Sequence, residues 1–582
     1  MKNLDLTIKI GGEAGQGLKT VGELLSYAFC RKGYHVFANQ ALQSRIRGGH
    51  NWFQLRVSDA AFQCPSAKTD ILVALDKESE YHFKELTPDS IVVLDSKQTG
   101  PLELDPGQGR ILDAPMLELA KQGGGNKLMI NTVAAALVMG LLDFDPAVLF
   151  GLLREIFAKK SKELGETNVS VAKAGYDFAL EKKLGEKMPD FKAAGPGKML
   201  IPGSEAIALG ALAAGCQFMS AYPMSPSTGI MTYLASKTRK FNFVMEQSED
   251  EIASINIALG ASYAGLRSMT ASSGGGFALM VEGLSLAGML ETPIVIVLAQ
   301  RPAPATGLPT RTAQEDLLFA IYAGHGEFAR FVTAPSDIES SFYAVARAFN
   351  LAEKYRIPAI ILTDQSLADS FATVDGFRLQ DIRIERNLMT EEELKKAGDG
   401  YKSYLLTKTG VSPRALPGNP FCFVTADSDE HDEDGRITED VDYTRPEMVK
   451  KRNIKAAGLL KEAKGPSWHG PANATDILIC WGSTRGAVQE AVDRLNKDNP
   501  RVAMAHFEDV WPLNPSYFDF LKKAKLAAVV ENNFTGQFAG LITKMTGHLA
   551  LERILKYNGM PFTADEIISA FEELRKKPSL RK

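Results

Sequence analysis

Short apolar runs alternate with amphipathic stretches along most of this chain, and this alternation limits the folds open to it. In the first third, strand candidates alternate with two helical patterns: residues 6–10, 18–32, 35–38, 70–75, 90–94 and 131–142. The same alternation returns at residues 199–385 and 471–582. Strands alternating with helices predict parallel sheets covered by helices. We therefore expect a multidomain α/β protein.

The length of 582 residues exceeds what one hydrophobic core supports and predicts about three or four domains. A lysine-rich stretch follows the first α/β region, and a polar stretch with an acidic run follows the second. The expected division is a first domain, a linker, a second α/β domain, a connector and a C-terminal domain: residues 1–185, 186–198, 199–385, 386–470 and 471–582.

Charge and hydropathy exclude two classes of partner. A net charge of −4 and a charged fraction of 23% give no sign of a polyanion, so we expect no nucleic acid. The longest apolar runs, 133–142 and 293–299, are shorter than the roughly 20 residues that span a bilayer. The first 17 residues also lack the apolar core of a signal peptide. We expect a soluble, cytoplasmic protein that does not contact a membrane.

The five cysteines lie far apart, and no CxxC is present. An iron–sulfur cluster needs several thiolates at close spacing, so we do not expect this chain to hold one. An odd, scattered set also argues against a disulfide framework. Buried, reduced thiols are expected at all five positions: Cys30, Cys64, Cys216, Cys422 and Cys480.

A glycine-rich turn lies between the first strand and the first helix, in KIGGEAGQGLKT. Gly12, Gly15 and Gly17 let the backbone approach a ligand, and the helix N-terminus offers unpaired N–H groups to an anion. A dinucleotide fold would end the next strand with an acidic residue, whereas Asn39 and Gln40 are neutral. The turn also lacks the Lys-Ser/Thr ending of a P-loop. A phosphate or coenzyme A site and a tight turn without ligand both stay open.

Downstream, SRIRGGHNW places Arg45, Arg47 and His50 around Gly48-Gly49. Two arginines beside a flexible turn are suited to phosphate groups. A surface loop with solvated charges explains the same residues equally well.

In the second α/β region, Glu249 and Glu251 precede an amphipathic run with apolar residues at helical spacing. The helix dipole favours carboxylates in a first turn, which is a purely structural explanation. A carboxyl held in a largely dry site can also share a proton with a ligand. The neighbouring segments decide between the two.

Three further segments supply groups suited to an active site. Ser272–Gly276 is a stretch of small residues, expected as a loop, where the backbone approaches a ligand. Tyr222-Pro223 leads into a rigid turn around the Ser225 hydroxyl. Arg301 follows an apolar strand, where open α/β sheets bind ligands, and is suited to a carboxylate. A plain exposed arginine is the alternative there.

Together these segments resemble the α subunits of the 2-oxoacid:ferredoxin oxidoreductases, with their Tyr-Pro-Ile-Thr-Pro, E-x-E, Ser-Gly-Gly-Gly and Gln-Arg…Gly-x-Pro-Thr motifs. The resemblance implies a pyrimidine-binding domain for thiamine diphosphate at residues 199–385. Within it, Glu251 matches the glutamate that hydrogen-bonds N1′ of the cofactor, with Glu249 as the alternative register. Ser225 replaces the family's threonine, and Arg301 matches the arginine that binds the oxoacid. The cofactor-binding set would include Tyr222, Pro223, Ser273, Gly274 and Gly275.

The two ends of the chain carry weaker resemblances to the same family. The glycine turn and the Arg-Gly-Gly segment resemble its Rossmann-like γ domain, although Ala14 stands where the family often has glycine. That implies a coenzyme A site involving Gly12, Gly15, Gly17 and Arg47. ICWGSTRGA and VVENNFTGQF resemble the transketolase-like C-terminal domain, for which packing and assembly are expected.

Two motifs suggest metal but fit it poorly. Thiamine enzymes bind Mg²⁺ and diphosphate through Gly-Asp-Gly after a buried strand, whereas Gly398-Asp399-Gly400 follows a polar helix and lacks the later asparagine. A glycine at a helix C-terminus explains it better. The acidic run 427–442 lacks EF-hand spacing and is expected as a solvated loop. It resembles a connector of 2-oxoglutarate-type α subunits. We expect no metal site in this chain.

The resemblance implies oxidative decarboxylation of a 2-oxoacid with coenzyme A, giving acyl-CoA, CO₂ and electrons for ferredoxin. Thiamine diphosphate would be shared with a β-type partner that supplies Mg²⁺ and a Fe₄S₄ cluster. A non-catalytic assembly subunit is the alternative. 2-Oxoglutarate is the favoured substrate over pyruvate or branched-chain 2-oxoacids, and it would need a second cation, for which Arg311 and His325 are candidates.

Overall fold

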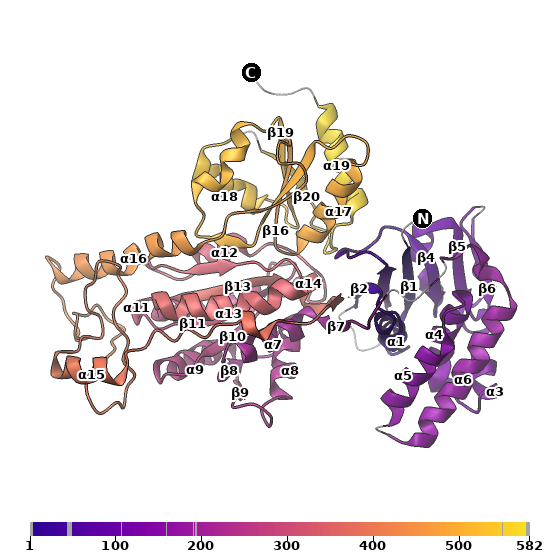
Figure 1. The fold of residues 1–582 in the computed structure, drawn as a ribbon, viewed down its shortest axis with the longest axis horizontal. Helices are drawn as coiled ribbons and strands as arrows, with labels where there is room; N and C mark the ends of the chain where they lie inside the picture. Colours follow the sequence, from indigo (N-terminus) through magenta and orange to yellow (C-terminus); the bar gives the residue numbers. More distant parts are fainter. Residues whose placement is uncertain are drawn as a thin grey trace. The chain divides into compact units, whose positions relative to one another are not determined.

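The computed structural model describes residues 4–43, 49–105, 107–158, 160–189, 191, 195–549 and 551–577. The chain forms two compact units (Figure 1). Unit 1 comprises Met1–Ile201, Ser370–Gly376 and Thr563–Asp565, and unit 2 comprises Pro202–Asp369, Phe377–Phe562 and Glu566–Lys582. Most of the three later predicted segments falls into unit 2, although Ser370–Gly376 and Thr563–Asp565 belong to unit 1. The boundaries at 385 and 470 stay predictions.

Unit 1 contains an eight-stranded sheet of order β6-β5-β4-β1-β3-β2-β14-β7. The expected parallel sheet is wrong for half of it: β1 pairs in parallel with β4, but β1, β2 and β14 take part in antiparallel pairs. Strand β3 lies between β1 and β2 and runs antiparallel to both, which gives this half of the sheet its antiparallel pairs. The strands are β1 Asp5–Glu13, β2 His35–Ala41, β3 His50–Ser58, β4 Thr69–Ala74, β5 Leu86–Leu94, β6 Arg110–Asp113, β7 Met199–Pro202 and β14 Phe371–Val374.

A layer of helices packs against this sheet (Figure 1). Helix α4 is buried along almost its whole length and packs between α1 and α6. Gly140 and Gly175 allow the close approach, since an added Cβ at Gly140 would lie 2.4 Å from the Tyr176 carbonyl oxygen. The helices are α1 Leu18–Arg31, η1 Lys77–Glu85, α2 Ser96–Thr99, α3 Met116–Gln122, η2 Lys127–Met129, α4 Ile130–Leu141, α5 Pro146–Ala158, α6 Lys162–Glu181 and η3 Leu184–Lys187.

Unit 2 contains a seven-stranded sheet of order β18-β12-β13-β11-β10-β8-β9. All neighbours pair in parallel except β12 and β18. The central strand β11 (IVIVLAQ) is wholly buried, as strands covered on both faces require. The strands are β8 Phe218–Ala221, β9 Val244–Gln247, β10 Ser268–Ser272, β11 Ile294–Gln300, β12 Phe331–Thr333, β13 Pro358–Asp364 and β18 Asp509–Trp511.

One prediction for the segments around this sheet is wrong. Ser272–Gly276 is not a loop, because helix α10 begins at Gly274. The helix α16 was also not expected. It is largely polar, and its buried face includes Lys451, Arg452 and Lys455. The helices are α7 Gly203–Ala213, α8 Thr228–Ala235, α9 Glu251–Tyr263, α10 Gly274–Leu279, α11 Val281–Met289, α12 Leu317–Tyr322, α13 Ile338–Tyr355, α14 Gln365–Asp369, η4 Leu379–Asp381, α15 Glu391–Ala397, η5 Gly398–Gly400 and α16 Thr444–Glu462.

A five-stranded sheet of order β15-β17-β16-β19-β20 completes unit 2. Its core is continuous with that around β11, since Ile296 and Trp481 belong to one buried cluster. The strands are β15 Ser467–His469, β16 Asp476–Trp481, β17 Val502–Phe507, β19 Leu526–Glu531 and β20 Glu552–Leu555. The helices are η6 Gly482–Thr484, α17 Arg485–Leu495, η7 Pro515–Lys522, α18 Gln537–Thr546 and α19 Ala564–Lys576.

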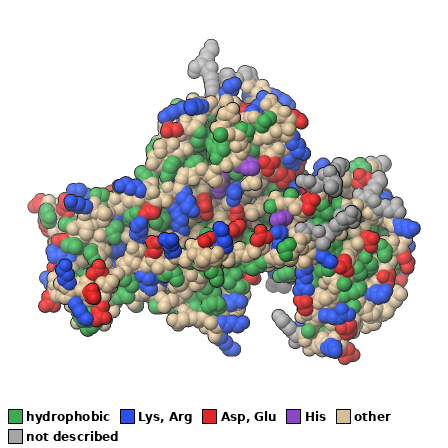
Figure 2. All heavy atoms as spheres, in the orientation of Figure 1, with side chains coloured by type: hydrophobic (Ala, Val, Ile, Leu, Met, Phe, Trp, Pro, Cys, Tyr) green, Lys and Arg blue, Asp and Glu red, His purple; other side chains and the backbone are tan. Residues whose placement is uncertain are grey.

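All five cysteines are free, as expected. Four of them are buried as predicted, whereas Cys422 is only partly buried. On the face drawn in Figure 2, basic and acidic side chains are interspersed. Within the described part of the chain, every helix is too short or too polar to cross a bilayer.

Candidate active site

Four neighbouring parallel strands, in the order β11-β10-β8-β9, end at the same edge of the sheet in unit 2. The segments that follow these strands carry the residues that the sequence singled out, from Tyr222, Glu249, Ser273 and Arg301 onward. Ligands of open α/β sheets bind at such carboxyl ends. The fold thus brings four segments, scattered over 80 residues of sequence, to one edge.

Glu251 is the first residue of α9 and is only 3% exposed. The side chain of Asp250 caps the helix by accepting from the Ala253 amide at 2.7 Å. Glu251 is therefore not needed as the cap, and its Oε1 atom is buried without a hydrogen-bond partner. Glu249, the alternative register, is exposed. A buried carboxyl oxygen without a donor is costly, which favours a ligand at this atom.

Two of the three glycines at the start of α10 lie against buried carboxyl groups, one against Glu251 and one against another residue. An added Cβ at Gly276 would lie 2.0 Å from Ser272 Oγ and 2.6 Å from Glu251 Oε1. At Gly274 it would lie 2.6 Å from Asp316 Oδ2, whereas at Gly275 its nearest atom, Ala305 O, is 3.8 Å away. Side chains at two of the three positions would therefore displace buried carboxyl groups.

Arg301 follows β11 and is 8% exposed. It donates from NH1 to the carbonyl oxygen of Ser225 at 2.7 Å, so two of the predicted catalytic residues are in contact. The contact uses the backbone of Ser225 rather than its hydroxyl, and Ser225 itself is exposed, as are Tyr222 and Pro223. Burial lowers the pKa of Arg301, an effect that the nearby Asp316 carboxylate opposes.

Asp316 was not singled out from the sequence. It is 7% exposed, and its Oδ2 atom has no hydrogen-bond partner. Burial and the Glu315 carboxylate raise the pKa of Asp316 to about 7, against the lowering effect of Arg301. No local pattern marks this residue, since Gly274 and Arg301, its neighbours in space, are distant in sequence.

Residues in the C-terminal part of the chain form hydrogen bonds that fix the segment carrying Asp316. The Gln314 amide donates to the Asn532 carbonyl oxygen at 2.7 Å, and Asn533 Nδ2 donates to the Gln314 carbonyl oxygen at 2.9 Å. Gln537 Oε1 accepts from the Leu318 amide at 3.0 Å. The VVENNFTGQF segment therefore positions part of the candidate site, a role beyond the packing expected of it.

In unit 1 the glycine turn joins β1 to α1. Gly15 and Gly17 have φ of 92° and 77°, and Gly17 is the N-cap of α1 without any side-chain cap. An added Cβ at Gly12 would lie 2.5 Å from Gln16 Oε1, and one at Gly17 would lie 1.9 Å from Asn131 Nδ2, so a side chain at either position would displace its neighbour. Arg47 lies outside the described residues. The coenzyme A interpretation of this turn stays a prediction.

A buried polar chain lies beside this turn. Nδ1 of His82 lies 2.9 Å from Glu85 Oε1, and its Nε2 lies 2.8 Å from His50 Nε2. Burial lowers the pKa of His82 to about 4, so the ring is neutral, donates to Glu85 and accepts from His50. Lys9 pairs with the same Glu85. The sequence marked only His50 of this group.

Two family models match the chain. The one described as "Pyruvate flavodoxin/ferredoxin oxidoreductase, thiamine diP-bdg" matches residues 209–451, and the one described as "Pyruvate ferredoxin/flavodoxin oxidoreductase" matches residues 7–178. A 2-oxoacid:ferredoxin oxidoreductase subunit alpha of Sulfolobus sp is 32% identical over 623 aligned positions, covering 96% of this chain and 95% of the relative. The chain belongs to the α subunits of the 2-oxoacid:ferredoxin oxidoreductases.

A solved relative of this oxidoreductase family agrees over the full length. The 2-oxoglutarate:ferredoxin oxidoreductase from Magnetococcus marinus, with 2-oxoglutarate, coenzyme A and succinyl-CoA bound, is 33% identical, with a TM-score of 0.91. The alignment covers 98% of this chain and 99% of that one. A 2-oxoglutarate synthase subunit KorA of Methanocaldococcus jannaschii is 32% identical over 57% of this chain and 86% of its own length.

The α-subunit site holds a group that suits one half of thiamine diphosphate. Glu251 Oε1 is a buried carboxyl oxygen without a hydrogen-bond partner, which a ligand such as an aminopyrimidine would satisfy, and Gly276 leaves the space that this carboxyl group occupies. Gly398-Asp399-Gly400 does not fit the diphosphate, because Gly398 ends helix α15 with φ of 48° and the motif follows no strand. The helix C-terminal interpretation of these glycines is confirmed.

The acidic side chains of residues 427–442 form hydrogen bonds and ion pairs within the connector. Asp432 Oδ1 accepts from the Asp434 and Arg436 amides, and Asp440 accepts from the Thr444 amide at 3.0 Å. Glu430 pairs with Arg445 and Arg452. Within the described ranges, no group of three or more His, Cys, Asp or Glu side chains is arranged to hold a metal ion.

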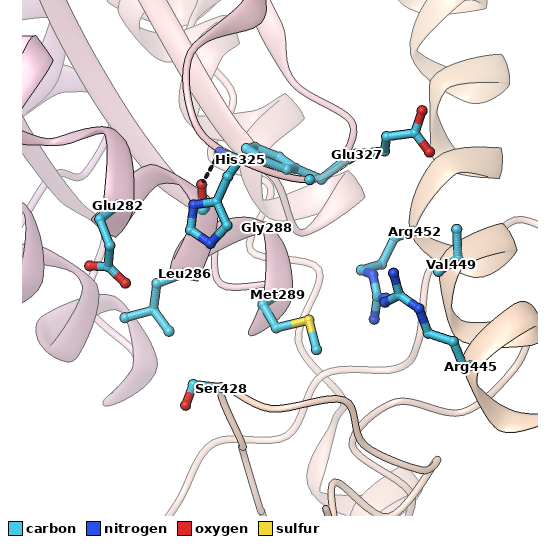
Figure 3. Close-up of a pocket in the computed structure, with 13 residues that line it drawn as sticks. Glu282, Leu286, Gly288, Met289, His325, Glu327, Ser428, Arg445, Val449 and Arg452 are labelled. Atoms are coloured by element: carbon cyan, nitrogen blue, oxygen red, sulfur yellow. Dashed lines mark hydrogen bonds between the residues drawn. The ribbon is translucent and has the colours of Figure 1, made fainter. Parts of the chain in front are cut away.

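His325, a candidate second cation, lies elsewhere in unit 2. It lines a cavity of about 350 Å³ between α11 and α16, with its backbone amide donating to Ser285 Oγ at 2.8 Å (Figure 3). The other cations of this cavity, Arg445 and Arg452, are bound by Glu430. Arg301 is absent from the lining of this cavity, so His325 as a second substrate cation stays a prediction. Arg311 donates to its neighbour's carbonyl oxygen, Thr310 O, at 3.1 Å.

Proposed function

We propose that this α subunit, with a β-type partner, catalyses the coenzyme A-dependent oxidative decarboxylation of a 2-oxoacid, with electrons passing to ferredoxin. The observation that carries the proposal is the buried, unpartnered Oε1 of Glu251 beneath Gly276. Bound thiamine diphosphate supplies the electron sink that decarboxylation requires. Tyr222, Pro223 and residues 273–275 of this chain would surround its pyrimidine ring.

Each residue of the site has a distinct task in this proposal. Glu251 holds and returns a proton at Oε1, which a carboxyl shielded from water can do efficiently. Arg301 binds the carboxylate of the 2-oxoacid, since its contact with the Ser225 carbonyl oxygen uses one of its five N–H donors and leaves others for a ligand. The Ser225 hydroxyl, exposed in this chain, would donate to the substrate's carbonyl group.

A partner would complete the site. Exposed apolar side chains lie on and around the segments that carry Glu251 and Arg301, as expected of a surface that another subunit covers: Tyr222, Ile252, Ile257, Leu279 and Leu308. We propose that a β-type subunit covers this surface and brings the Mg²⁺–diphosphate site and the Fe₄S₄ cluster. 2-Oxoglutarate is the favoured substrate because the full-length relative from Magnetococcus marinus has it bound.

The test is to co-produce the chain with the β-type protein encoded beside it and to assay a panel of 2-oxoacids with coenzyme A and a viologen acceptor. Glu251→Gln should abolish turnover in a complex that still assembles, because an amide cannot exchange the proton. Glu249→Gln is the matched control and should retain activity, since Glu249 is exposed. No turnover of any 2-oxoacid, or full activity of Glu251→Gln, would refute the proposal.

A further inference from the structure

Asp316 lies where it can act on Arg301. It directly precedes helix α12, and its carboxyl group faces the glycines of α10, with Gly274 leaving the room it occupies. Its own amide donates to Gln300 Oε1 at 3.0 Å, which fixes the residue next to the end of β11, one position before Arg301. No hydrogen bond or ion pair joins Asp316 to Arg301 in the structure, and the interaction between the two groups is electrostatic.

Few charged groups face Asp316. Glu315 precedes it and accepts from the Ala303 amide at 2.9 Å, and Arg301 lies across the site. The C-terminal segment that binds Gln314 and Glu315 contributes the uncharged amides of Asn533 and Gln537. Behind them lies the buried Glu531 carboxyl, which accepts from Asn533 Nδ2 at 2.9 Å. The protonation of Asp316 is thus governed by burial, by one like charge and by one opposite charge.

We propose that Asp316 is a positioning residue that sets how strongly Arg301 attracts the carboxylate of the 2-oxoacid. With a proton on Asp316, the guanidinium charge is unopposed. Without it, the two charges offset each other and the substrate anion binds less tightly. The inference rests on the proposed role of Arg301, and it makes substrate affinity, rather than the chemical step, the quantity that depends on pH.

The unpartnered Oδ2 atom supports this assignment. A buried carboxylate kept only for structure would be expected to accept hydrogen bonds at both oxygens, as Asp337 does at the start of α13 from Ser340 and Arg485. Asp316 instead has its amide bound to Gln300 Oε1 and its carbonyl oxygen bound to the Ala320 amide, while its buried Oδ2 atom has no hydrogen-bond partner.

The kinetic test uses the assembled complex with 2-oxoglutarate, and with pyruvate if 2-oxoglutarate is not turned over. The KM of the wild-type complex should rise by roughly tenfold between about pH 6 and pH 8.5, with kcat changing little, because the Asp316 proton is lost in this range. Asp316→Asn should keep a low KM across the range. Glu315→Gln, a matched variant in the same segment, should move the rise to lower pH, because removing a like charge eases ionisation of Asp316.

A substrate-free readout separates this inference from the proposed function. In infrared spectra of the purified chain, the carbonyl stretch of one protonated carboxyl group should disappear near neutral pH in the wild type and be missing from Asp316→Asn. The inference is supported if the KM of Asp316→Asn does not depend on pH and if the wild type shows the carboxyl band that Asp316→Asn lacks. A wild-type KM independent of pH, an unchanged rise in Asp316→Asn, or no such band would overturn it. Absence of any turnover contradicts the proposed function, and the infrared result then decides the protonation of Asp316 by itself.

Discussion

At the scale of single residues, two buried carboxyl oxygens without donors flank one short glycine segment. Leaving a buried polar group unsatisfied costs about 1–3 kcal/mol, and more when the group is charged. Glu251 and Asp316 nevertheless keep such atoms on opposite sides of Gly274–Gly276. Positions at which a protein tolerates this cost are those where a ligand is expected to satisfy the group.

Gly276→Ala should lower turnover by at least about tenfold, because an added methyl group would lie 2.6 Å from Glu251 Oε1 and displace the carboxyl. Gly540→Ala, in helix α18, is the matched control. Its methyl group meets no atom within 4 Å, and alanine is the better helix former by about 1 kcal/mol. Steady-state kinetics and thermal melts of both complexes provide the measurement. Equal losses of activity in the two variants would contradict this view of the glycines.

The sequence predicted Glu251, Ser225 and Arg301 as one site but not Asp316. The first three carry patterns that can be recognised locally, namely a helix start, a proline-bounded turn and a strand end. Asp316 acquires its environment from Gly274 and Gln300 through the tertiary fold alone. The Ser225 contact was also not predictable, since it is made by a backbone carbonyl oxygen.

At the scale of elements, helix α16 is attached to the sheet domain by a buried ionic group. Lys451 and Lys455 both donate to the Glu291 carboxylate, and Arg356 donates to the Glu291 carbonyl oxygen at 3.1 Å. Glu291 is 1% exposed, and burial lowers the pKa of both lysines. The network therefore depends on the carboxylate that the lysines share.

Glu291→Gln should reduce the free energy of unfolding by about 3–5 kcal/mol, because two buried ammonium groups would lose their counter-charge. Urea denaturation followed by circular dichroism measures this change. Glu447→Gln, on the exposed face of the same helix, is the control and should have little effect, since its partner Lys450 is 3.8 Å away and exposed. A similarly small effect of Glu291→Gln would show that α16 is attached mainly by apolar contacts.

Two of the elements that the sequence missed, β3 and α16, share a physical cause. Strand β3 (HNWFQLRVS) carries polar residues along its length, yet it is almost wholly buried because β1 and β2 cover both of its edges. Helix α16 buries lysines whose partner, Glu291, is 160 positions earlier for Lys451. Apolar periodicity identifies elements that bury hydrocarbon, such as β11 and α4, and fails where the buried groups are polar and their partners distant.

At the scale of the whole molecule, the oxidoreductase subunit leaves apolar side chains exposed beside its own site. Leu279, on α10, is 49% exposed, and Ile252, on α9, is also 49% exposed. Both helices begin at residues that contribute to the site. The site is thus built at a surface suited to a second subunit.

Leu279→Glu should abolish co-purification with the β-type partner while leaving the fold of the chain unchanged, because a buried, unpaired carboxylate would face the interface. Leu128→Glu is the control, since Leu128 is 85% exposed and belongs to unit 1. Pull-down and size-exclusion chromatography of the co-produced proteins give the readout. Normal assembly of Leu279→Glu would exclude this surface as the docking site.

The strand order of unit 1 bears on how this protein can be dissected. Strand β14, encoded more than 300 residues after β2, pairs with β2, and β7 follows it in the sheet. A gene fragment ending at the predicted linker would therefore express β1–β6 with the β2 edge unpaired, and such an open edge promotes aggregation. A soluble excised version would need the peptide of residues 370–376 restored, for example grafted behind β7 by a short engineered loop. In the intact chain, the strand that completes the first sheet is thus encoded between two stretches of unit 2.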